Sequence, residues 1–501
     1  MSAEIILVTG ANGYIASRLI PRLLQKGYRV RALARRPERL AGRGWLPDVQ
    51  VVQGDVHEPE SLAAALAGVH TAYYLIHSMA SGRGYTRFEL EAARRFASAA
   101  ERAGIQHIIY LGGLADPNAR NIAPHMRSRI ETGQSLREGR VPVTEFRAGV
   151  IAGPGSISFE MIRFLTECFP LLPGPNWLRN KSQPVATVNV IDYLMAALDH
   201  PEARGGIYEM GGPQVMLYSD TMLRYAEVRG LKRMLFTLPG IPISLMARFV
   251  DWLTPVPFSI ATPLVGGLQS DSIVLDDSAR RLFPEIELIP YEQAVSESLQ
   301  DLAPGRLERV WEGIGRESVR IRHEGFFVDY RRLQVNAPAE GVYRVFTSLG
   351  GGQGWLYANW LWRLRGWLDK WLGILIGRPG KVYADSTQRP KDANEIEKHS
   401  RQGSLALDSD TSTTGLRDGD RIDYYRVEAL EPNRMMRLHS ELCAPGDGWM
   451  EWRIESGVLT QTAFFAPRGL PGFLYWYLLG PLHRLVFRGL IQAIKRRSEN
   501  R

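Results

Sequence analysis

Cysteine is scarce in this chain. Its 501 residues include only Cys168 and Cys443, which lie far apart in the sequence. Two distant thiols exclude a disulfide framework and a CxxC metal site, so the composition favours a reducing, cytoplasmic compartment. A secretory signal is not expected either, because no basic segment precedes the apolar run 5–8 and this run is too short. Repeats of solenoid length and low-complexity tracts are absent as well.

Uncharged stretches long enough to span a bilayer are also missing. The segment 469–483 has no Asp, Glu, Lys or Arg, but it falls short of the roughly 20 residues that a spanning helix needs. Pro471 and Pro481 interrupt it further. This segment suits either an interfacial helix or plain core packing. A second apolar segment, 235–269, contains five prolines that forbid one continuous helix, so it is expected to form a cap, a lid or an interfacial segment.

Positive charge is concentrated in the last third of the chain. From Arg306 onward there are 30 Lys and Arg against 23 Asp and Glu, which accounts for +7 of the net charge of +8. Nine of the twelve tryptophans lie in the same part. A basic, Trp-rich module suits an anionic partner or a peripheral membrane contact, while a solvated basic face over an aromatic core explains it equally simply. No recognised nucleic-acid module is present, so no nucleic-acid partner is expected.

The first half of the chain alternates strand-like and helix-like segments. Strands are expected at 5–8, 29–34, 49–52, 70–77, 108–111 and 143–147, and helices at 15–26, 58–67, 88–103 and 126–137. This rhythm predicts an α/β fold, namely a Rossmann-type, doubly wound parallel sheet with helices on both faces. Ligands of such sheets bind beyond the carboxyl ends of the strands.

The pattern changes at a junction near 304–315, which predicts two domains, 1–305 and 316–501. Strands are expected in the second domain at 320–335, 435–444 and 457–466, with exposed hairpins and loops over 381–428. Strongly apolar helices are expected at 355–376 and 470–494.

A glycine-rich loop joins the first strand to the first helix, in the sequence Thr9-Gly10-Ala11-Asn12-Gly13-Tyr14-Ile15-Ala16. This is the context that a dinucleotide-binding loop requires. Gly10 permits a tight turn, Gly13 lets the backbone approach a pyrophosphate, and Ala16 allows close packing of helix on strand. The start of the helix favours an anion through its free N–H groups and its dipole.

The end of the second strand bears on which dinucleotide is bound. Sites that prefer NAD usually carry an acidic residue there for the ribose 2′-hydroxyl. This chain has Arg35 and Arg36 instead, and a guanidinium offers a fork of donors to a 2′-phosphate. The two arginines also suit plain surface charges. We expect NADP(H) in preference to NAD.

The third strand is followed by Gly54-Asp55-Val56. Asp55 suits acceptance from an adenine amino group and Val56 suits packing on the ring, although Asp55 would equally cap the next helix. The candidate cofactor-binding residues are Thr9, Gly10, Asn12, Gly13, Tyr14, Ile15, Arg35, Arg36, Asp55, Val56, Ile76 and His77.

Together with this loop, three further motifs resemble those of atypical short-chain dehydrogenases/reductases of the NmrA-like group. They are AYYLIHSM at 72–79, FRAGVIAGPG at 146–155 and MGGP at 210–213. The likeness covers about residues 3–300. The remainder resembles a C-terminal module fused to some bacterial members, of helix-grip, START-like shape and poorly defined function. In a helix-grip domain the Trp-rich helix at 355–376 would be buried and would close a cavity for an apolar ligand.

The resemblance fails at the catalytic residues of active short-chain dehydrogenases. They pair Tyr-x-x-x-Lys with a Ser, and no Tyr-x-x-x-Lys occurs anywhere in this chain. The Ser expected after the fifth strand is replaced by Leu111-Gly112-Gly113. His125 is the best remaining proton donor, although it also suits a surface position at a helix start. Arg127 stands near where many relatives have Lys, but a guanidinium does not readily give up a proton.

Three hypotheses follow. The first is an NADP(H)-dependent oxidoreductase acting on a hydrophobic carbonyl, quinone or enone near His77, Gly112 and His125, with a C-terminal module that binds a small hydrophobic substrate or lipid. The second is a non-catalytic NADP(H)-binding redox sensor or scaffold, suggested by the missing Tyr-Lys-Ser set. The third is a lipid-binding or assembly protein at the membrane surface.

Overall fold

A computed structural model describes residues 4–40, 43–77, 85–119, 122–254, 256, 258–302, 304, 319–323, 326–350, 354–375, 416–442 and 444–500. The chain divides into two compact units, one formed mainly by the residues up to 314 and the other mainly by those from 326 onward. The predicted domain bounds at 305 and 316 stay predictions, because the junction 305–318 lies outside the described residues.

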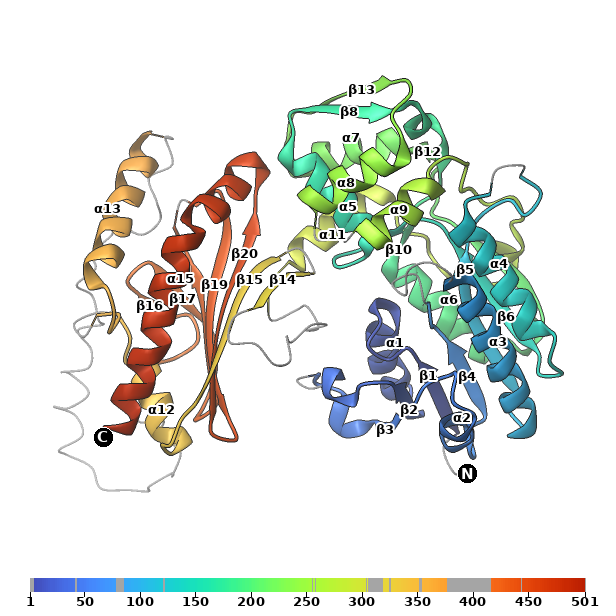
Figure 1. Cartoon of the computed structure of the whole chain (residues 1–501), viewed down its shortest axis with the longest axis horizontal. Helices are drawn as coiled ribbons and strands as arrows, with labels where there is room; N and C mark the ends of the chain where they lie inside the picture. Colours follow the sequence, from blue (N-terminus) through green and yellow to red (C-terminus); the bar gives the residue numbers. More distant parts are fainter. Residues whose placement is uncertain are drawn as a thin grey trace. The chain divides into compact units, whose positions relative to one another are not determined.

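The N-terminal unit is built on a seven-stranded sheet in the order β11-β6-β5-β4-β1-β2-β3, all of whose pairs are parallel. The strands are β1 (Ile5–Thr9), β2 (Arg29–Ala34), β3 (Gln50–Gln53), β4 (Thr71–Tyr74), β5 (His107–Gly113), β6 (Val143–Ala148) and β11 (Ile207–Met210). The strand order reverses between β1 and β4, so the predicted Rossmann-type sheet is confirmed (Figure 1).

Helices cover both faces of this sheet. They are α1 (Tyr14–Gln25), α2 (Pro59–Leu66), α3 (Tyr85–Arg102), α4 (Pro124–Arg137) and α6 (Thr187–Asp199). Neighbouring strand residues point to opposite faces: Tyr73 joins the apolar cluster that contains α1 and α6, whereas Tyr74 joins the one that contains α2 and α3. Burial on both faces explains why the strands read as continuous apolar runs.

The rest of this unit packs as a smaller layer that contains the segment expected to form a cap. Its larger elements are α5 (Ile157–Cys168), β8 (Leu171–Pro175), α7 (Tyr218–Arg229), β13 (Met234–Leu238), α8 (Ile243–Leu253), α9 (Phe258–Gly267) and α11 (Tyr291–Gln300). Short elements are η1 (Pro37–Leu40), η2 (Leu46–Asp48), β7 (Ile151–Ala152), η4 (Asn176–Arg179), β9 (Lys181–Ser182), β10 (Val185–Ala186), η5 (Pro201–Ala203), β12 (Met216–Leu217) and α10 (Ser278–Leu282).

The C-terminal unit is a seven-stranded sheet in the order β14-β15-β20-β19-β18-β17-β16. Its strands are β14 (Val319–His323), β15 (Phe326–Gln334), β16 (Arg421–Ile422), β17 (Tyr425–Glu431), β18 (Met435–Ser440), β19 (Gly446–Glu455) and β20 (Val458–Pro467). The pairings from β15 to β16 are antiparallel. The helices are α12 (Ala339–Phe346), α13 (Asn359–Leu375) and α15 (Gly469–Glu499), the last packed along β20 and β15 (Figure 1). This arrangement is compatible with the expected helix-grip shape.

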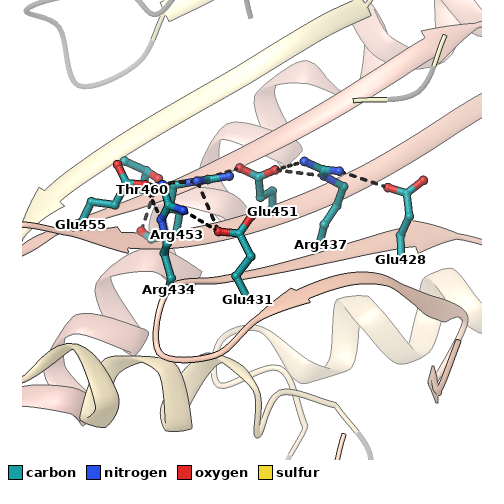
Figure 2. A network of polar contacts seen from close by, with 8 residues as sticks. All are labelled: Glu428, Glu431, Arg434, Arg437, Glu451, Arg453, Glu455 and Thr460. Atoms are coloured by element: carbon teal, nitrogen blue, oxygen red, sulfur yellow. Dashed lines mark hydrogen bonds and ion pairs between the residues drawn. The ribbon is translucent and has the colours of Figure 1, made fainter. Parts of the chain in front are cut away.

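The two faces of this sheet differ. Met436, Leu438 and Trp452 belong to the apolar core that also contains residues of α12 and α15. On the alternate positions of the same strands lies a network of ion pairs, in which Arg437 contacts Glu451 at 2.8 Å (Figure 2). Glu451 is only 1% exposed, so its pairing with Arg437 offsets much of the penalty for burying its charge.

Two expectations for this unit need correction, and a third falls mostly outside the described residues. The C-terminal helix is not interrupted, because α15 runs through Pro471 and Pro481; Pro471 lies in its first turn, where no N–H is needed. The Trp-rich helix begins only at Asn359 and is not buried all round, since Trp360 and Trp367 are 65% and 55% exposed. Most of the expected loop region 381–428 lies outside the described residues. Within the described part, no helix is both long and apolar enough to cross a membrane.

Candidate functional site

The glycine loop forms a tight turn between β1 and α1. Gly10 has a φ of +64°, and a Cβ there would lie 2.8 Å from the Leu75 carbonyl oxygen. The Gly13 N–H donates to the Gly10 carbonyl at 2.7 Å, which closes the turn. The tight turn predicted at Gly10 is confirmed, because a side chain there would meet both strain and a backbone clash. The approach of the Gly13 backbone to a pyrophosphate stays a prediction.

The start of α1 is built to receive an anion. Gly13 is the N-cap, no side chain caps the helix, and its first turn contains no acidic residue. The first N–H groups of a helix have no intrahelical partner, so they and the helix dipole face the loop. Asn12 lies beside them, and its side-chain amide carries two N–H donors; its Oδ1 atom, buried with no hydrogen-bond partner, only accepts and does not contribute to binding an anion. These features fit a phosphate group of a dinucleotide.

Two other residues of the loop have structural partners. The Thr9 hydroxyl is buried, donates to the Tyr73 carbonyl at 3.0 Å and accepts from the Leu75 N–H at 3.0 Å, which ties β1 to the β4 strand end. The Tyr14 hydroxyl lies 2.8 Å from the Thr187 hydroxyl of α6. Ile15 packs against the apolar core. The assignment of Thr9, Tyr14 and Ile15 to the cofactor stays a prediction, and their contacts explain them by packing.

The second strand ends in exposed basic groups, as expected. Arg35 and Arg36 are exposed, and Arg35 Nη1 lies 3.9 Å from Asp55 Oδ2. The Asp55 Oδ1 atom accepts from the His57 N–H at 3.0 Å, so Asp55 supports a turn ahead of α2, whose N-cap is Glu58. An adenosine 2′-phosphate would find two exposed guanidinium groups at this edge.

The hydrophobic candidates beside Asp55 are less accessible. Val56 is buried in the cluster between the sheet and the helices α2 and α3, and Ile76 packs against the same cluster. Both residues lie close to the ends of β3 and β4, in or against this apolar cluster. Their direct contact with an adenine or nicotinamide ring stays a prediction.

After the end of β4, His77 contacts Arg129, which was not among the predicted site residues. Arg129 Nη1 lies 3.0 Å from His77 Nε2. Burial and the nearby Arg129 charge hold the pKa of His77 well below its usual range, so the imidazole is neutral and accepts from the guanidinium. A Cβ on Gly113 of β5 would lie 2.8 Å from Arg129 Cδ, which shows how closely this side chain follows the strand end.

His125 lies at the start of α4 and is buried against α9. A Cβ on Gly267 of α9 would lie 2.7 Å from its Cε1 atom, and its Nδ1 atom has no hydrogen-bond partner. Burial, with a smaller effect of the Arg129 charge, lowers the pKa of His125 to about 3. The imidazole is therefore neutral near pH 7, and the role of His125 as proton donor stays a prediction.

Arg129, rather than Arg127, is the arginine of α4 that reaches His77. Arg127 is exposed, whereas Arg129 is half-buried and holds His77. The sequence did contain a signal for this. His125 and Arg129 are four residues apart, the spacing of Tyr-x-x-x-Lys, and residues four apart share one face of a helix.

An apolar cavity of about 100 Å³ lies in the smaller layer of this unit, and we call it the lid cavity. Its walls come from α5, α7, α8 and α9, and the described lining residues carry no charge. Leu264, Val265 and Leu268 line it, and they flank the Gly267 that packs against His125. The cavity therefore lies one helix away from the strand ends that bear the candidate site.

Comparison with known proteins assigns the first unit. Residues 2–203 match the NmrA-like family. The N-terminal domain belongs to the NmrA-like group. Residues 323–490 match a family described as protein of unknown function, DUF2867, so the second domain gains no activity from this match.

Two relatives of the NmrA-like domain align over most of their own length. One is a (4-alkanoyl-5-oxo-2,5-dihydrofuran-3-yl)methyl phosphate reductase of Streptomyces griseus, 29% identical over 50% of this chain and 83% of the relative. The other is a ceramide reductase of Caulobacter vibrioides, 27% identical over 49% of this chain and 77% of the relative. Both are reductases, which supports an NAD(P)-dependent oxidoreductase.

Among solved structures, the Citrobacter triphenylmethane reductase complexed with NADP(H) is 22% identical, with a TM-score of 0.48. It matches 58% of this chain and 99% of its own. The Escherichia coli quinone oxidoreductase complexed with NADPH is 19% identical, with a TM-score of 0.47, over 59% of this chain and 99% of its own.

Proposed function

We propose that the NmrA-like domain is an NADP(H)-dependent reductase of a hydrophobic acceptor. The observation that carries the proposal is the uncapped start of α1 behind the Gly10–Gly13 turn, with the exposed Arg35 and Arg36 at the neighbouring strand end. The first feature suits a pyrophosphate and the second suits a 2′-phosphate, so the two together favour NADP(H) over NAD.

Different residues would bind different parts of the dinucleotide. The N–H groups at the start of α1, with Asn12, would hold the pyrophosphate, and Arg35 would pair with the 2′-phosphate. Asp55 would face the adenine at the end of β3. His77 follows the end of β4, and Arg129 of α4 contacts it, on the side where a nicotinamide would reach. When bound, this cofactor supplies a hydride.

The acceptor class follows from the surroundings of Arg129. The guanidinium can stabilise negative charge on an acceptor oxygen, but it cannot donate its proton, and His125 is neutral. The proton that completes the reduction must then come from water. Among carbonyls, quinones and enones, the conjugated acceptors fit best, because their charge develops on an oxygen away from the carbon that takes the hydride. The lid cavity would take an apolar part of the acceptor.

Cofactor titration tests the first part of this proposal. NADPH and NADH are titrated into the full chain while tryptophan fluorescence is followed. We expect NADPH to bind at least tenfold more tightly. Arg35→Asp should lower the affinity for NADPH by about 10- to 100-fold, since a charged hydrogen bond contributes about 1.5–3 kcal/mol. Arg29→Asp, at the other end of β2, is the matched control and should leave binding unchanged.

An acceptor screen tests the second part. NADPH oxidation is followed with a quinone, an enone and an aliphatic ketone, each carrying an apolar substituent. Turnover with a conjugated acceptor that falls at least tenfold in Arg129→Met, but not in Arg127→Met, supports the assignment. NADPH that stays unoxidised with all three classes would count against a reductase.

A second candidate is a redox sensor or scaffold that binds NADP(H) without catalysis. The low pKa of His125 favours it, because no poised proton donor is found near the site in the described residues. A further relative, the photosystem II assembly factor Ycf39 of Trieres chinensis, is 22% identical over 257 residues, and its name describes assembly rather than chemistry. Tight NADPH binding without turnover would support this candidate, and turnover with any acceptor would exclude it.

The C-terminal domain also suits a membrane surface. Five leucines of α15 form one exposed stripe at helical spacing: Leu470, Leu474, Leu478, Leu482 and Leu485. Arg484 and Arg488 lie at its end and are exposed. An apolar stripe beside basic groups is typical of a helix that rests in an anionic lipid interface. We propose a peripheral membrane contact for this face, which flotation with anionic vesicles at low salt would detect.

A further inference from the structure

The C-terminal domain encloses a second, larger cavity, which we call the sheet cavity. Its volume is about 670 Å³, within the range of about 300–1,000 Å³ that ligand pockets show. The walls come from α13, α15 and the strands β17 to β20, and they are mostly apolar and aromatic. Leu364 and Leu482 line the cavity and are 43% and 38% exposed, so it reaches the surface between α13 and α15.

One charged side chain, Arg365 of α13, lines this cavity among the described residues. Its Nε atom is buried and has no hydrogen-bond partner, and its guanidinium lies 5.5 Å from the centre of the Tyr475 ring. The groups beside it are the hydroxyls of Tyr475, which is a hydrogen-bond partner, Tyr425 and Tyr424, and no carboxylate of the described residues is among them. A cation placed in an apolar cavity without an anion is costly, which points to a partner from outside the chain.

The neighbouring histidine does not supply that partner. His483 of α15 stacks on Phe487 with ring centres 5.3 Å apart, and its Nδ1 atom is buried without a hydrogen-bond partner. Burial, with a smaller effect of Arg365, lowers the pKa of His483 to about 3, so this imidazole is neutral near pH 7. The cavity thus carries one positive charge and one neutral ring nitrogen at its polar end.

Aromatic side chains form a large part of the remaining wall. Trp476 stacks on Phe465 with ring centres 5.7 Å apart, and Phe465 also contacts Tyr475 at 5.2 Å. These rings give a flat, apolar surface that lies beside the guanidinium. A planar fork of N–H groups matches a carboxylate or a phosphate, while the rings match a hydrocarbon chain.

We propose that the sheet cavity binds a single-chain amphiphile whose carboxylate or phosphate head pairs with Arg365 and whose hydrocarbon tail lies against Phe465 and Trp476. His483 donates a further hydrogen bond to the head group when its proton lies on Nδ1. The site goes beyond the proposed reductase activity, because it lies wholly within the other domain and uses none of the cofactor residues.

The test compares head groups on one tail. Decanoate, decyl phosphate and decanol are titrated into the full chain by calorimetry, without NADPH. We expect at least one of the two anions to bind tenfold or more tightly than decanol. The stronger of the two identifies whether a carboxylate or a phosphate is preferred.

Variants assign the difference to one residue. Arg365→Gln should lower the affinity for the preferred anion at least tenfold and leave the affinity for decanol unchanged. Arg365→Lys should keep most of the affinity for the anion. Arg363→Gln is the matched control, because Arg363 is exposed two residues away on the same helix. It should change nothing.

Two results would overturn the proposal. One is equal binding of decanol and both anions by the unmodified chain, or no binding of any. The other is binding only to phosphatidylglycerol vesicles and not to the monomeric amphiphiles, which would assign the anion to a lipid surface. The comparison of head groups needs no variant, so a failure of Arg365→Gln to fold leaves the test decisive.

Discussion

Single buried charges connect the sheet of the NmrA-like domain to its helices. Glu145 of β6 is fully buried, pairs with Arg147 at 2.7 Å and also contacts Arg137 of α4. Gly133 of α4 makes room for the carboxylate, since a Cβ there would collide with it. One acidic group thus fixes α4, and with it the helix that carries Arg129, against the sheet.

Loss of this carboxylate should therefore lower the free energy of unfolding considerably. Glu145→Gln leaves two arginines without their buried partner, and we expect the free energy of unfolding to fall by about 3–5 kcal/mol in urea denaturation. Glu138→Gln is the control, because Glu138 pairs with Arg94 at 3.0 Å where both side chains are more than half exposed. It should change stability by about 0–1 kcal/mol. Equal losses would show that Glu145 is not the fixing group.

The low pKa of His125 leads to one prediction on how stability depends on pH and to another on the rate of NADPH oxidation. Its folded pKa of about 3 lies below the unfolded value near 6.5, so its contribution is complete above pH 6.5 and is lost as the pH falls through that range. Below pH 6, the free energy of unfolding of the unmodified chain should fall by about 1.4 kcal/mol per pH unit because of His125. The variant His125→Gln should not show this part of the loss. Thermal unfolding monitored between pH 7 and pH 5 measures this.

Two further measurements complete that test. The pKa of His200 is raised by its hydrogen bond to Glu202, so His200→Gln should alter the pH dependence with the opposite sign. If NADPH oxidation is found, His125→Gln should keep it within tenfold. A loss of about 100-fold or more would restore His125 as the general acid.

At the scale of elements, the exposed stripe of α15 predicts a lipid contact. Leu478 and Leu485 are 74% and 57% exposed, and burying one leucine gains about 1.5–3 kcal/mol. The chain should float with vesicles of phosphatidylglycerol at low salt, and Leu478→Glu with Leu485→Glu should reduce the bound fraction at least tenfold. Leu275→Glu, an exposed leucine of the other domain, should not. A chain that stays unbound at low salt would end the membrane proposal.

The sequence predicted the elements of the N-terminal sheet closely because most of its strands are buried on both faces. Arg29–Ala34 is found as expected, and the other strands differ by a few residues at their ends. The C-terminal helices were harder to predict. Whether α15 continues through Pro481, and which tryptophans of α13 are covered, depends on packing against the sheet, which periodicity does not encode.

The candidate site was predictable only where neighbouring residues in the sequence form it. The turn at Gly10 and Gly13 follows from backbone conformation, which a short motif specifies. The His77–Arg129 contact joins residues 52 positions apart, and the packing of His125 on Gly267 joins residues further apart still. No single-sequence pattern brings such residues together, so the contact of Arg129 with His77 could not be predicted, and the role of Arg127 stays a prediction.

At the scale of the whole molecule, two domains with two separate sites should respond to two different ligands. A ligand that binds only the folded state at 100 times its dissociation constant stabilises its domain by about 2.7 kcal/mol. In calorimetric scans NADPH should raise the transition of the N-terminal domain, and decanoate or decyl phosphate should raise that of the C-terminal domain. Arg35→Asp should remove the first shift alone, and Arg365→Gln the second alone. One transition that both ligands move together would mean that the domains unfold as a unit, and the reductase and the amphiphile site would then have to be treated as thermodynamically linked.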